Sequence, residues 1–262
     1  MPINLNLVFG YLDYLFSAGT KHSIHSPFIY DFATKVLNSS IQDHRFELIE
    51  QMRSKMLNSK ALIALDDFGA VDQTHYSKKL SEIVKSASKQ AKYARLLYRI
   101  IAYYQPKVLL ELGTNVGISA MYQALSLTEN QYLFSIEGSA KLAEIARHNI
   151  AKLGLNTNVQ IVEGNFDDVL PKLLTKLTQL DFVFLDGNHR KSATIDYFEQ
   201  LIPHINTQTI IVVDDINWSA GMQAAWHHII DHEKTKVSID LYFMGIVFFR
   251  EELSKEHFTI RF

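Results

Sequence analysis

From residue 107 onward, short apolar runs alternate with longer segments that place apolar side chains at helical spacing. The runs are nearly continuous, a pattern typical of strands that are covered on both faces in a parallel sheet. They occupy residues 108–112, 132–136, 159–162, 182–185 and 209–213. One intervening segment, residues 139–153, begins with a serine that can cap a helix and carries one apolar face. This order predicts a doubly wound, Rossmann-like α/β fold.

Two further apolar runs, at residues 237–241 and 245–249, lie near the end of the chain. The interval between them has no room for a crossover helix, so we expect a terminal antiparallel hairpin. Together with the five earlier runs, this hairpin predicts a mostly parallel sheet of seven strands.

Residues 1–105 have a different pattern, in which apolar residues recur three and four positions apart, as in helices. One series is Phe28, Phe32 and Val36, which follows the helix-starting pair Ser26-Pro27. Another series consists of Tyr93, Leu96, Leu97, Ile100 and Ile101. The polar stretch at 66–72 is expected to be a loop. We therefore expect a helical extension over residues 1–105, serving as a lid or as a homodimer surface, and a second domain over residues 106–262.

Composition and charge narrow the classes of function. The net charge of −2 gives no electrostatic footprint for nucleic acid or for an anionic membrane. The chain has no cysteine, which excludes disulfides and thiolate metal sites. The longest apolar run, residues 242–249, is too short to cross a bilayer. We expect a cytoplasmic protein that acts on a small molecule and binds neither nucleic acid nor membrane.

Each of the five predicted parallel strands ends in a carboxylate. These residues are Glu111, Glu137, Glu163, Asp186 and Asp214. In an open α/β sheet, ligands bind in the crevice outside the carboxyl ends of the strands. One acid at such a position is unremarkable, whereas five in succession indicate a ligand-related role for most of them.

The turn after the first strand discriminates between cofactors. It reads E-L-G-T-N-V-G-I-S at 111–119 and has two glycines where a dinucleotide-binding loop has three. Glu111 precedes them and would repel a pyrophosphate, but it would attract a ligand with an ammonium and a sulfonium group. Gly113 permits a tight turn, Gly117 permits close approach, and Ser119 with the first helical amides could hold a carboxylate. A cation next to a carboxylate describes the methionine end of S-adenosylmethionine.

The next two turns indicate a nucleoside. Glu137, followed by Gly138, ends the second strand, where an acid typically accepts hydrogen bonds from ribose hydroxyls. NAD enzymes use an acid in the same way, so this residue does not name the ligand. After the third strand comes Gly164, then Asn165, which can hydrogen-bond to adenine, and Phe166, which can pack against it. A plain turn accounts for these residues equally well.

In their order, these motifs resemble the class I S-adenosylmethionine-dependent methyltransferases, and most of all the small metal-dependent O-methyltransferases of the catechol and caffeoyl-CoA types. The motifs are E-L-G-T-N-V-G-I-S at 111–119, S-I-E-G at 135–138, V-E-G-N-F at 162–166, D-F-V-F-L-D-G-N-H at 181–189 and V-V-D-D-I-N-W-S at 212–219. The resemblance implies that residues 106–262 bind S-adenosylmethionine and transfer its methyl group to a hydroxyl oxygen of a small molecule. The residues expected to contact the cofactor are Glu111, Gly113, Thr114, Asn115, Gly117, Ser119, Glu137, Gly138, Gly164, Asn165, Phe166 and Asp186.

The resemblance also implies a divalent cation, usually Mg²⁺, bound by Asp186, Asp214 and Asp215. The residues themselves agree, because three carboxylates from strand ends make a hard, all-oxygen site that suits Mg²⁺. Such a cation could lower the pKa of a substrate hydroxyl. The alternative is that the adjacent pair Asp214-Asp215 caps the next helix and that Asp186 binds the cofactor.

A catalytic base is also expected close to Asp186. In the resembling enzymes a lysine often stands three residues after this aspartate, and here His189 takes that place. A neutral imidazole is a suitable proton acceptor near pH 7. Lys191 is a competitor nearby. Trp218, after the predicted metal ligands, could form a wall of the substrate pocket.

Two other functions remain open at this stage. One is an NAD(P)-dependent oxidoreductase on the same fold, which the incomplete glycine fingerprint and Glu111 count against. The other is a non-catalytic binding protein that retains the methyltransferase fold, with the N-terminal helices as its main surface. The sequence does not name the methyl acceptor.

Overall fold

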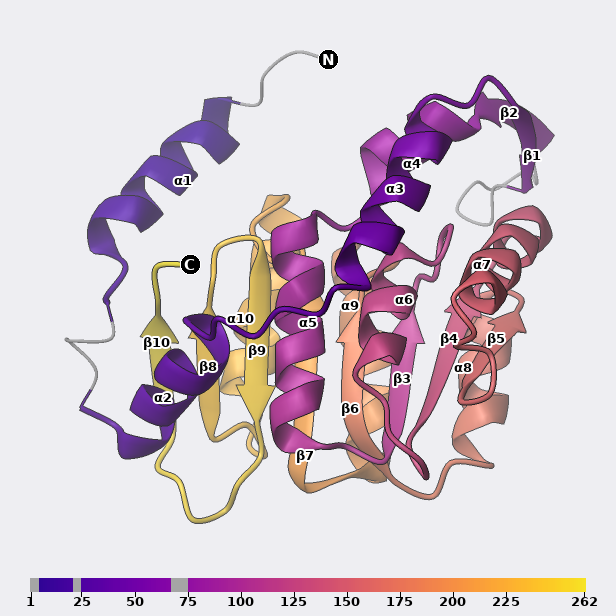
Figure 1. The fold of residues 1–262 in the computed structure, drawn as a ribbon. Coiled ribbons are helices and arrows are strands. Elements are labelled where there is room, and N and C mark those ends of the chain that lie inside the picture. The colour runs from indigo at the N-terminus through magenta and orange to yellow at the C-terminus, as the bar shows by residue number, and fades with distance from the viewer. Residues whose placement is uncertain (1–4, 21–24, 67–74) are drawn as a thin grey trace. The chain divides into compact units, whose positions relative to one another are not determined.

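The computed structural model describes residues 5–20, 25–66 and 75–262. The chain forms two compact units, whose helices and strands are labelled in Figure 1. We call Met1–Asn38 together with Gln179–Phe262 the first unit, and Ser39–Thr178 the second unit. The boundary predicted between residues 105 and 106 falls inside the second unit, so the N-terminal helices are divided between the two.

Three parallel strands lie side by side in the second unit, in the order β3-β4-β5. They are β3 (Val108–Leu112), β4 (Tyr132–Glu137) and β5 (Val159–Glu163). Their bounds agree with the predicted runs to within one residue. The register pairs Glu111 with Ser135, and Glu137 with Glu163. The first three strand-end carboxylates therefore lie toward one edge of these strands.

Helices follow each of these strands and precede the first. They are α5 (Ala91–Tyr104), α6 (Ile118–Leu125), α7 (Ala140–Lys152) and α8 (Phe166–Leu174). Ser139 caps α7 as predicted, since its hydroxyl accepts a hydrogen bond from the Leu142 amide at 3.5 Å. The predicted apolar face of α5 is buried throughout, which confirms that helix.

The second unit also contains two helices and a hairpin from the N-terminal third. They are α3 (Phe46–Leu57), β1 (Leu62–Asp66), β2 (His75–Lys79) and α4 (Leu80–Ala87). The antiparallel pair β1-β2 was not predicted, because β2 reads H-Y-S-K-K and has no apolar run. The loop predicted at 66–72 begins at the end of β1, and its remaining residues lie outside the described part of the chain.

Five strands pair in the first unit, in the order β10-β8-β9-β7-β6. They are β6 (Leu180–Leu185), β7 (Ile205–Asp214), β8 (Val237–Asp240), β9 (Met244–Phe248) and β10 (Glu256–Thr259). The predicted hairpin is confirmed, since β8 and β9 are antiparallel. Apart from the β1-β2 pair, the described residues hold three strands in the second unit and five in the first, so the prediction of seven strands is wrong by one. The missed strand, β10, has only four residues and a polar start, so it lacks an apolar run.

The helices of the first unit come from both ends of the chain. They are α1 (Leu5–Ser17), α2 (Pro27–Phe32), the π-helical turn Ala33–Leu37, α9 (Lys191–Leu201), the 3₁₀ turn Ile202–His204 and α10 (Ala220–Asp231). The start of α2 at Pro27 confirms the predicted helix start. Phe28 and Phe32 pack edge-on against Phe248 of β9, with ring centroids 5.0 and 5.5 Å away. These aromatic contacts fix α2 on the sheet of its unit.

A tryptophan and a glycine make a tight contact in the core of the first unit. Trp226 on α10 is 3% exposed, and a Cβ added to Gly245 of β9 would lie 2.6 Å from its ring.

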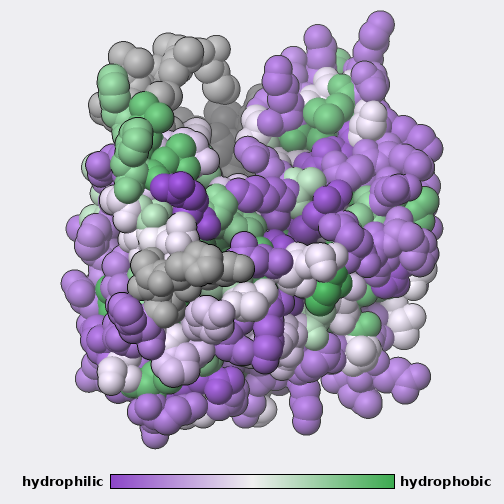
Figure 2. Space-filling view, turned by 60° about the vertical axis from the view of Figure 1, so that its left-hand side comes forward, coloured by the Kyte–Doolittle hydropathy of each residue, from purple (hydrophilic) through white to green (hydrophobic). Residues whose placement is uncertain are grey.

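On the face shown in Figure 2, most side chains are hydrophilic and the apolar ones form small separate groups. Among the helices of the described residues, none combines the length and the apolar character needed to span a membrane.

Candidate functional site

The turn after β3 is held in a left-handed backbone conformation at three positions. Gly113, Asn115 and Gly117 have φ angles of 103°, 51° and 86°. The amide of Gly113 donates to the carbonyl of Ile136 at 3.0 Å, which ties the turn to β4. A Cβ at position 117 would lie 3.2 Å from the backbone of Ala146 on α7. Gly117 is thus required both by its φ angle and by the close approach of a helix.

Glu111 is fully buried beneath this turn, and other side chains already bind its carboxylate. Gln123 donates to its Oε1 at 2.6 Å and Ser135 donates to its Oε2 at 2.5 Å. Ser119 donates to it as well. Burial raises the pKa of Glu111 to about 7, and these hydrogen bonds oppose the rise only in part. Glu111 and Ser119, both expected to contact a ligand, therefore contact each other.

Glu137 joins the turns after β3 and β4. Its Oε2 accepts the amide of Asn115 at 2.7 Å and its Oε1 accepts the amide of Ser139 at 2.9 Å. The amide of Gly138 also donates to it. Burial raises the pKa of Glu137, and the three backbone donors oppose that rise. Since each carboxylate oxygen has two acceptor positions, Glu137 retains capacity for a ligand hydroxyl.

Two more of the expected cofactor residues have structural partners in the second unit. The Thr114 hydroxyl lies 2.5 Å from that of Ser135. The side chain of Asn165 caps α8 by accepting the amide of Asp167 at 3.3 Å. Phe166 is the first residue of α8 and is half-buried. Capping of α8 therefore gives Asn165 a structural role, which agrees with the alternative that this segment is a plain turn.

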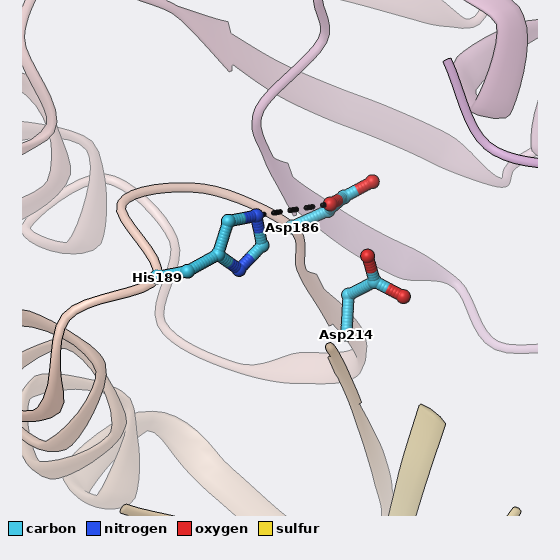
Figure 3. A group of neighbouring side chains, drawn as sticks. All are labelled: Asp186, His189 and Asp214. Atoms are coloured by element: carbon cyan, nitrogen blue, oxygen red, sulfur yellow. Dashed lines mark ion pairs between the residues drawn. The ribbon is translucent and has the colours of Figure 1, made fainter. Parts of the chain in front are cut away.

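The second group of predicted residues lies in the first unit and forms an acidic centre. Asp186 follows β6, Asp214 ends β7, and His189 lies on the loop between β6 and α9 (Figure 3). One donor atom from each of the three lies within 4.8 Å of the others. The His189 Nε2 is 3.8 Å from Asp186 Oδ1, and Asp214 is buried. We call Asp186, His189 and Asp214 the acidic centre.

Asp215, the third predicted metal ligand, is outside this group of donor atoms. Its Oδ2 lies 3.8 Å from His189 Nε2, and its amide donates to the carbonyl of Phe243 at 2.7 Å. Its φ angle is 53°, and that of Asn188 is also 53°. Non-glycine residues in this region are uncommon and cluster at functional sites. The group of donor atoms thus contains two carboxylates and an imidazole, and Asp215, the third predicted ligand, lies beside the imidazole.

The acidic centre is chemically suited to a divalent cation. Carboxylate oxygens suit Mg²⁺ and Mn²⁺, and an imidazole is a ligand that transition metals accept.

Lys191, the competing base, is the exposed first residue of α9. Trp218 is 56% exposed, as expected of a residue that could line a pocket.

Two residues that hold Glu111, Gln123 and Ser135, were not predicted from the sequence. Gln123 lies one turn into α6, and Ser135 lies opposite Glu111 in the register of β3 and β4. Gln123 belongs to none of the motifs, and Ser135 begins the motif S-I-E-G at 135–138, which gives no sign that it meets Glu111. Only the pairing of the strands, which sequence periodicity does not specify, places Ser135 there.

Comparison with known proteins gives a consistent result. Residues 110–216 match a family described as methyltransferase domain. The chain is 34% identical over 128 residues to a catechol O-methyltransferase of Niastella koreensis, which covers 48% of this chain and 56% of that protein. It is 36% identical over 97 residues to catechol O-methyltransferase of Bos taurus, covering 36% of each. The chain thus spans about half, or less, of the length of these curated relatives.

Solved structures with the same fold are more distant in sequence. An O-methyltransferase from Bacillus cereus in complex with S-adenosylhomocysteine has a TM-score of 0.58 and 18% identity, covering 80% of this chain and 92% of that one. The O-methyltransferase TomG from Streptomyces achromogenes, in complex with S-adenosylmethionine, has a TM-score of 0.58 and 20% identity, covering 83% and 96%. These matches confirm the predicted Rossmann-like α/β fold. Residues 110–216 are thus similar to methyltransferase domains, and the chain has the same fold as these solved structures.

Proposed function

We propose that this protein is an S-adenosylmethionine-dependent methyltransferase that transfers a methyl group to a hydroxyl oxygen of a small molecule. The observation that carries the proposal is the hydrogen-bonded pair of turns after β3 and β4, joined through Glu137, within the segment that matches methyltransferase domains. The first three curated relatives are named O-methyltransferases, which supports oxygen as the acceptor atom.

The cofactor half of the proposal uses the second unit. Backbone groups of the turn from Gly113 to Gly117 would hold the methionine end, and Glu137 would accept hydrogen bonds from the ribose. Glu111 would act from beneath the turn, since its carboxylate is fully buried and bonded to Gln123. Its task in this proposal is to position the turn, which differs from the direct contact that the sequence suggested.

The acceptor half uses the acidic centre. Asp186, Asp214 and Asp215 would hold a divalent cation, and the His189 Nε2 would stay off the metal, 3.8 Å from a carboxylate oxygen of Asp186 and of Asp215. When bound, such a cation would lower the pKa of a hydroxyl held beside it. The acceptor oxygen forms a bond to the methyl carbon while the bond from that carbon to sulfur breaks, and S-adenosylhomocysteine leaves. The hydroxyl proton goes to a base, and His189 Nε2 is the atom we propose for it.

The two halves can be tested by separate measurements. Calorimetry should detect binding of S-adenosylmethionine and S-adenosylhomocysteine, and NAD should not compete. Absence of S-adenosylmethionine binding would contradict the proposal, and tight binding of NAD would favour the oxidoreductase alternative.

The acidic centre is tested with a matched pair of variants. Asp214→Asn removes a buried carboxylate of the centre, whereas Asp196→Asn removes an exposed carboxylate on α9. We expect Asp214→Asn to weaken Mn²⁺ binding at least about tenfold, by analogy with the losses seen when metal-site partners are removed. Asp196→Asn should bind Mn²⁺ like the unaltered protein. Equal Mn²⁺ affinity of both variants would contradict the metal assignment.

A further inference from the structure

A cavity of about 450 Å³ lies within the first unit. Its walls come from three parts of the chain that are far apart in sequence. They are α1 near the N-terminus, the segment 217–220 between β7 and α10, and the turn between β8 and β9 with the end of β10. The segment 217–220 begins two residues after Asp215. The cavity therefore shares a loop with the predicted metal ligands.

One wall of the cavity is fixed by hydrogen bonds around Tyr242. Asp240 accepts the amide of Tyr242 at 2.6 Å, and Asn217 donates to its carbonyl at 2.9 Å. Tyr242 has a φ angle of 69°, which is rare for an aromatic residue and persists only where its surroundings enforce it. The carbonyl of the next residue, Phe243, accepts the amide of Asp215. This wall is therefore tied to the loop that carries Asp215.

A second wall is α1, which packs against Tyr242 and is anchored in the first unit. A Cβ added to Gly10 would lie 2.9 Å from the Tyr242 hydroxyl, so glycine allows the helix to approach closely. The buried Tyr14 hydroxyl donates to the carbonyl of Ile260 at 2.5 Å. Just past the helix, the amide of Gly19 donates to the carbonyl of Thr259 at 2.9 Å. These contacts hold α1 in place as one wall of the cavity.

The lining of the cavity combines carboxylates with aromatic rings. Asp13 and Asp240 supply the carboxylates, and Tyr14, Trp218 and Tyr242 supply the rings. None of the lining residues is Lys, Arg or His. Within the described chain, neither carboxylate takes part in a salt bridge. Carboxylates attract an ammonium group by charge, and aromatic faces attract it through their quadrupoles.

We propose that this cavity binds an amine-bearing small molecule through its ammonium group. This inference rests on the proposed function in one respect, namely that the amine would be the part of the methyl acceptor that does not react. The volume is in the range of small-molecule sites. The chemistry disfavours anionic acceptors, because two carboxylates would repel them.

Trp218 offers a direct signal for binding. The chain has two tryptophans, and Trp226 is 3% exposed and does not line the cavity. We would label the indole nitrogens with ¹⁵N in the full chain and titrate it with cadaverine, a five-carbon diamine. The uncharged probe is the five-carbon diol of the same length. We expect cadaverine, and not the diol, to shift the Trp218 signal with saturation.

The matched variants are Asp13→Asn and Asp231→Asn. Asp13 is exposed, so its replacement leaves the wall around Tyr242 intact, whereas Asp231 is an exposed residue at the end of α10 outside the cavity. Asp13→Asn should weaken cadaverine binding about three- to fivefold, as expected for a partly screened ion pair. Asp231→Asn should have no effect. Equal binding of diamine and diol, or equal effects of the two variants, would overturn the proposal.

Binding of S-adenosylhomocysteine is measured on the same samples. Its loss would contradict the proposed function, whereas the cadaverine titration reports on the cavity alone. Asp13→Asn should leave the affinity for S-adenosylhomocysteine unchanged, because the residues proposed for that ligand lie in the second unit. The failure of one inference is thereby distinguishable from the failure of the other.

Discussion

Glu111 and Glu137 end neighbouring strands, but their carboxylates have different partners. Glu111 is bonded by the side chains of Gln123 and Ser135, whereas Glu137 accepts backbone amides from two turns. Burial raises the pKa of both. Keeping Glu111 ionised in this environment opposes folding, since burial favours the neutral form. Glu111 thus costs stability where it joins β3 to β4 and α6, and a buried carboxylate with so perturbed a pKa is a candidate for a functional role.

The pKa of Glu111 leads to a pH-dependent prediction. Because it rises from 4.5 to about 7 on folding, the folded chain binds more protons between these values. Proton binding to Glu111 therefore stabilises the folded chain at low pH, and this stabilisation is lost as the pH rises through about 7. Glutamine stays neutral at both pH values. Relative to the unaltered protein, Glu111→Gln should therefore have a higher free energy of unfolding at pH 8 than at pH 5, by on the order of 2–3 kcal/mol.

Urea unfolding at both pH values measures this difference. Glu163→Gln is the control, since Glu163 also ends a strand but is exposed. An equal effect of Glu111→Gln at pH 5 and pH 8 would show that burial does not control the ionisation of this residue.

At the scale of elements, the junction of α6 and α7 determines the shape of the turn from Gly113 to Gly117. Gly117 caps α6 in a left-handed conformation and faces the backbone of Ala146 on α7. The turn and the two helices are thus packed together. The loop after β7, in the first unit, carries Asp215 and contributes to the cavity beside α1.

Two glycine replacements separate backbone strain from crowding. Gly154 has a φ angle of 67° but has no atom within 4 Å of an added Cβ, whereas Gly117 has both a positive φ and a neighbour at 3.2 Å. Gly154→Ala should lower the free energy of unfolding by about 1 kcal/mol, from strain alone. Gly117→Ala should lower it by about 2–3 kcal/mol, because overpacking adds to the strain. Similar losses in thermal unfolding would indicate that α7 moves to make room.

At the scale of the whole molecule, the proposed function is divided between the units. The cofactor residues of the turns after β3, β4 and β5 belong to the second unit, and the acidic centre belongs to the first. Cofactor binding and metal binding should therefore depend on different parts of the chain.

Removal of metal tests this division. Treatment with EDTA should abolish formation of S-adenosylhomocysteine in the presence of an acceptor. The affinity of the protein for S-adenosylhomocysteine should change less than about twofold, as expected when two binding sites are energetically independent. Calorimetry with and without EDTA, and a turnover assay restored by Mg²⁺ or Mn²⁺, make the comparison. A large loss of S-adenosylhomocysteine affinity on chelation would contradict it.

The sequence by itself determined the parallel strands, the helices α5 and α7, and the terminal hairpin. Elements that are buried continuously or on one face need apolar residues at matching positions, and that pattern is visible locally in the sequence. It also placed Glu111, Glu137, Asp186 and Asp214 at strand ends. It did not reveal β10 or the β1-β2 pair, whose short or polar strands depend on their neighbours for pairing.

Only the tertiary structure decided what surrounds each carboxylate. Strand register placed Ser135 against Glu111, and the folding of a loop placed His189 rather than Asp215 among the donor atoms with Asp214. The same holds for the cavity, which is lined by both Asp13 and Asp240 although more than two hundred residues separate them in the sequence. Such contacts join residues far apart in the chain, and local periodicity carries no information about them.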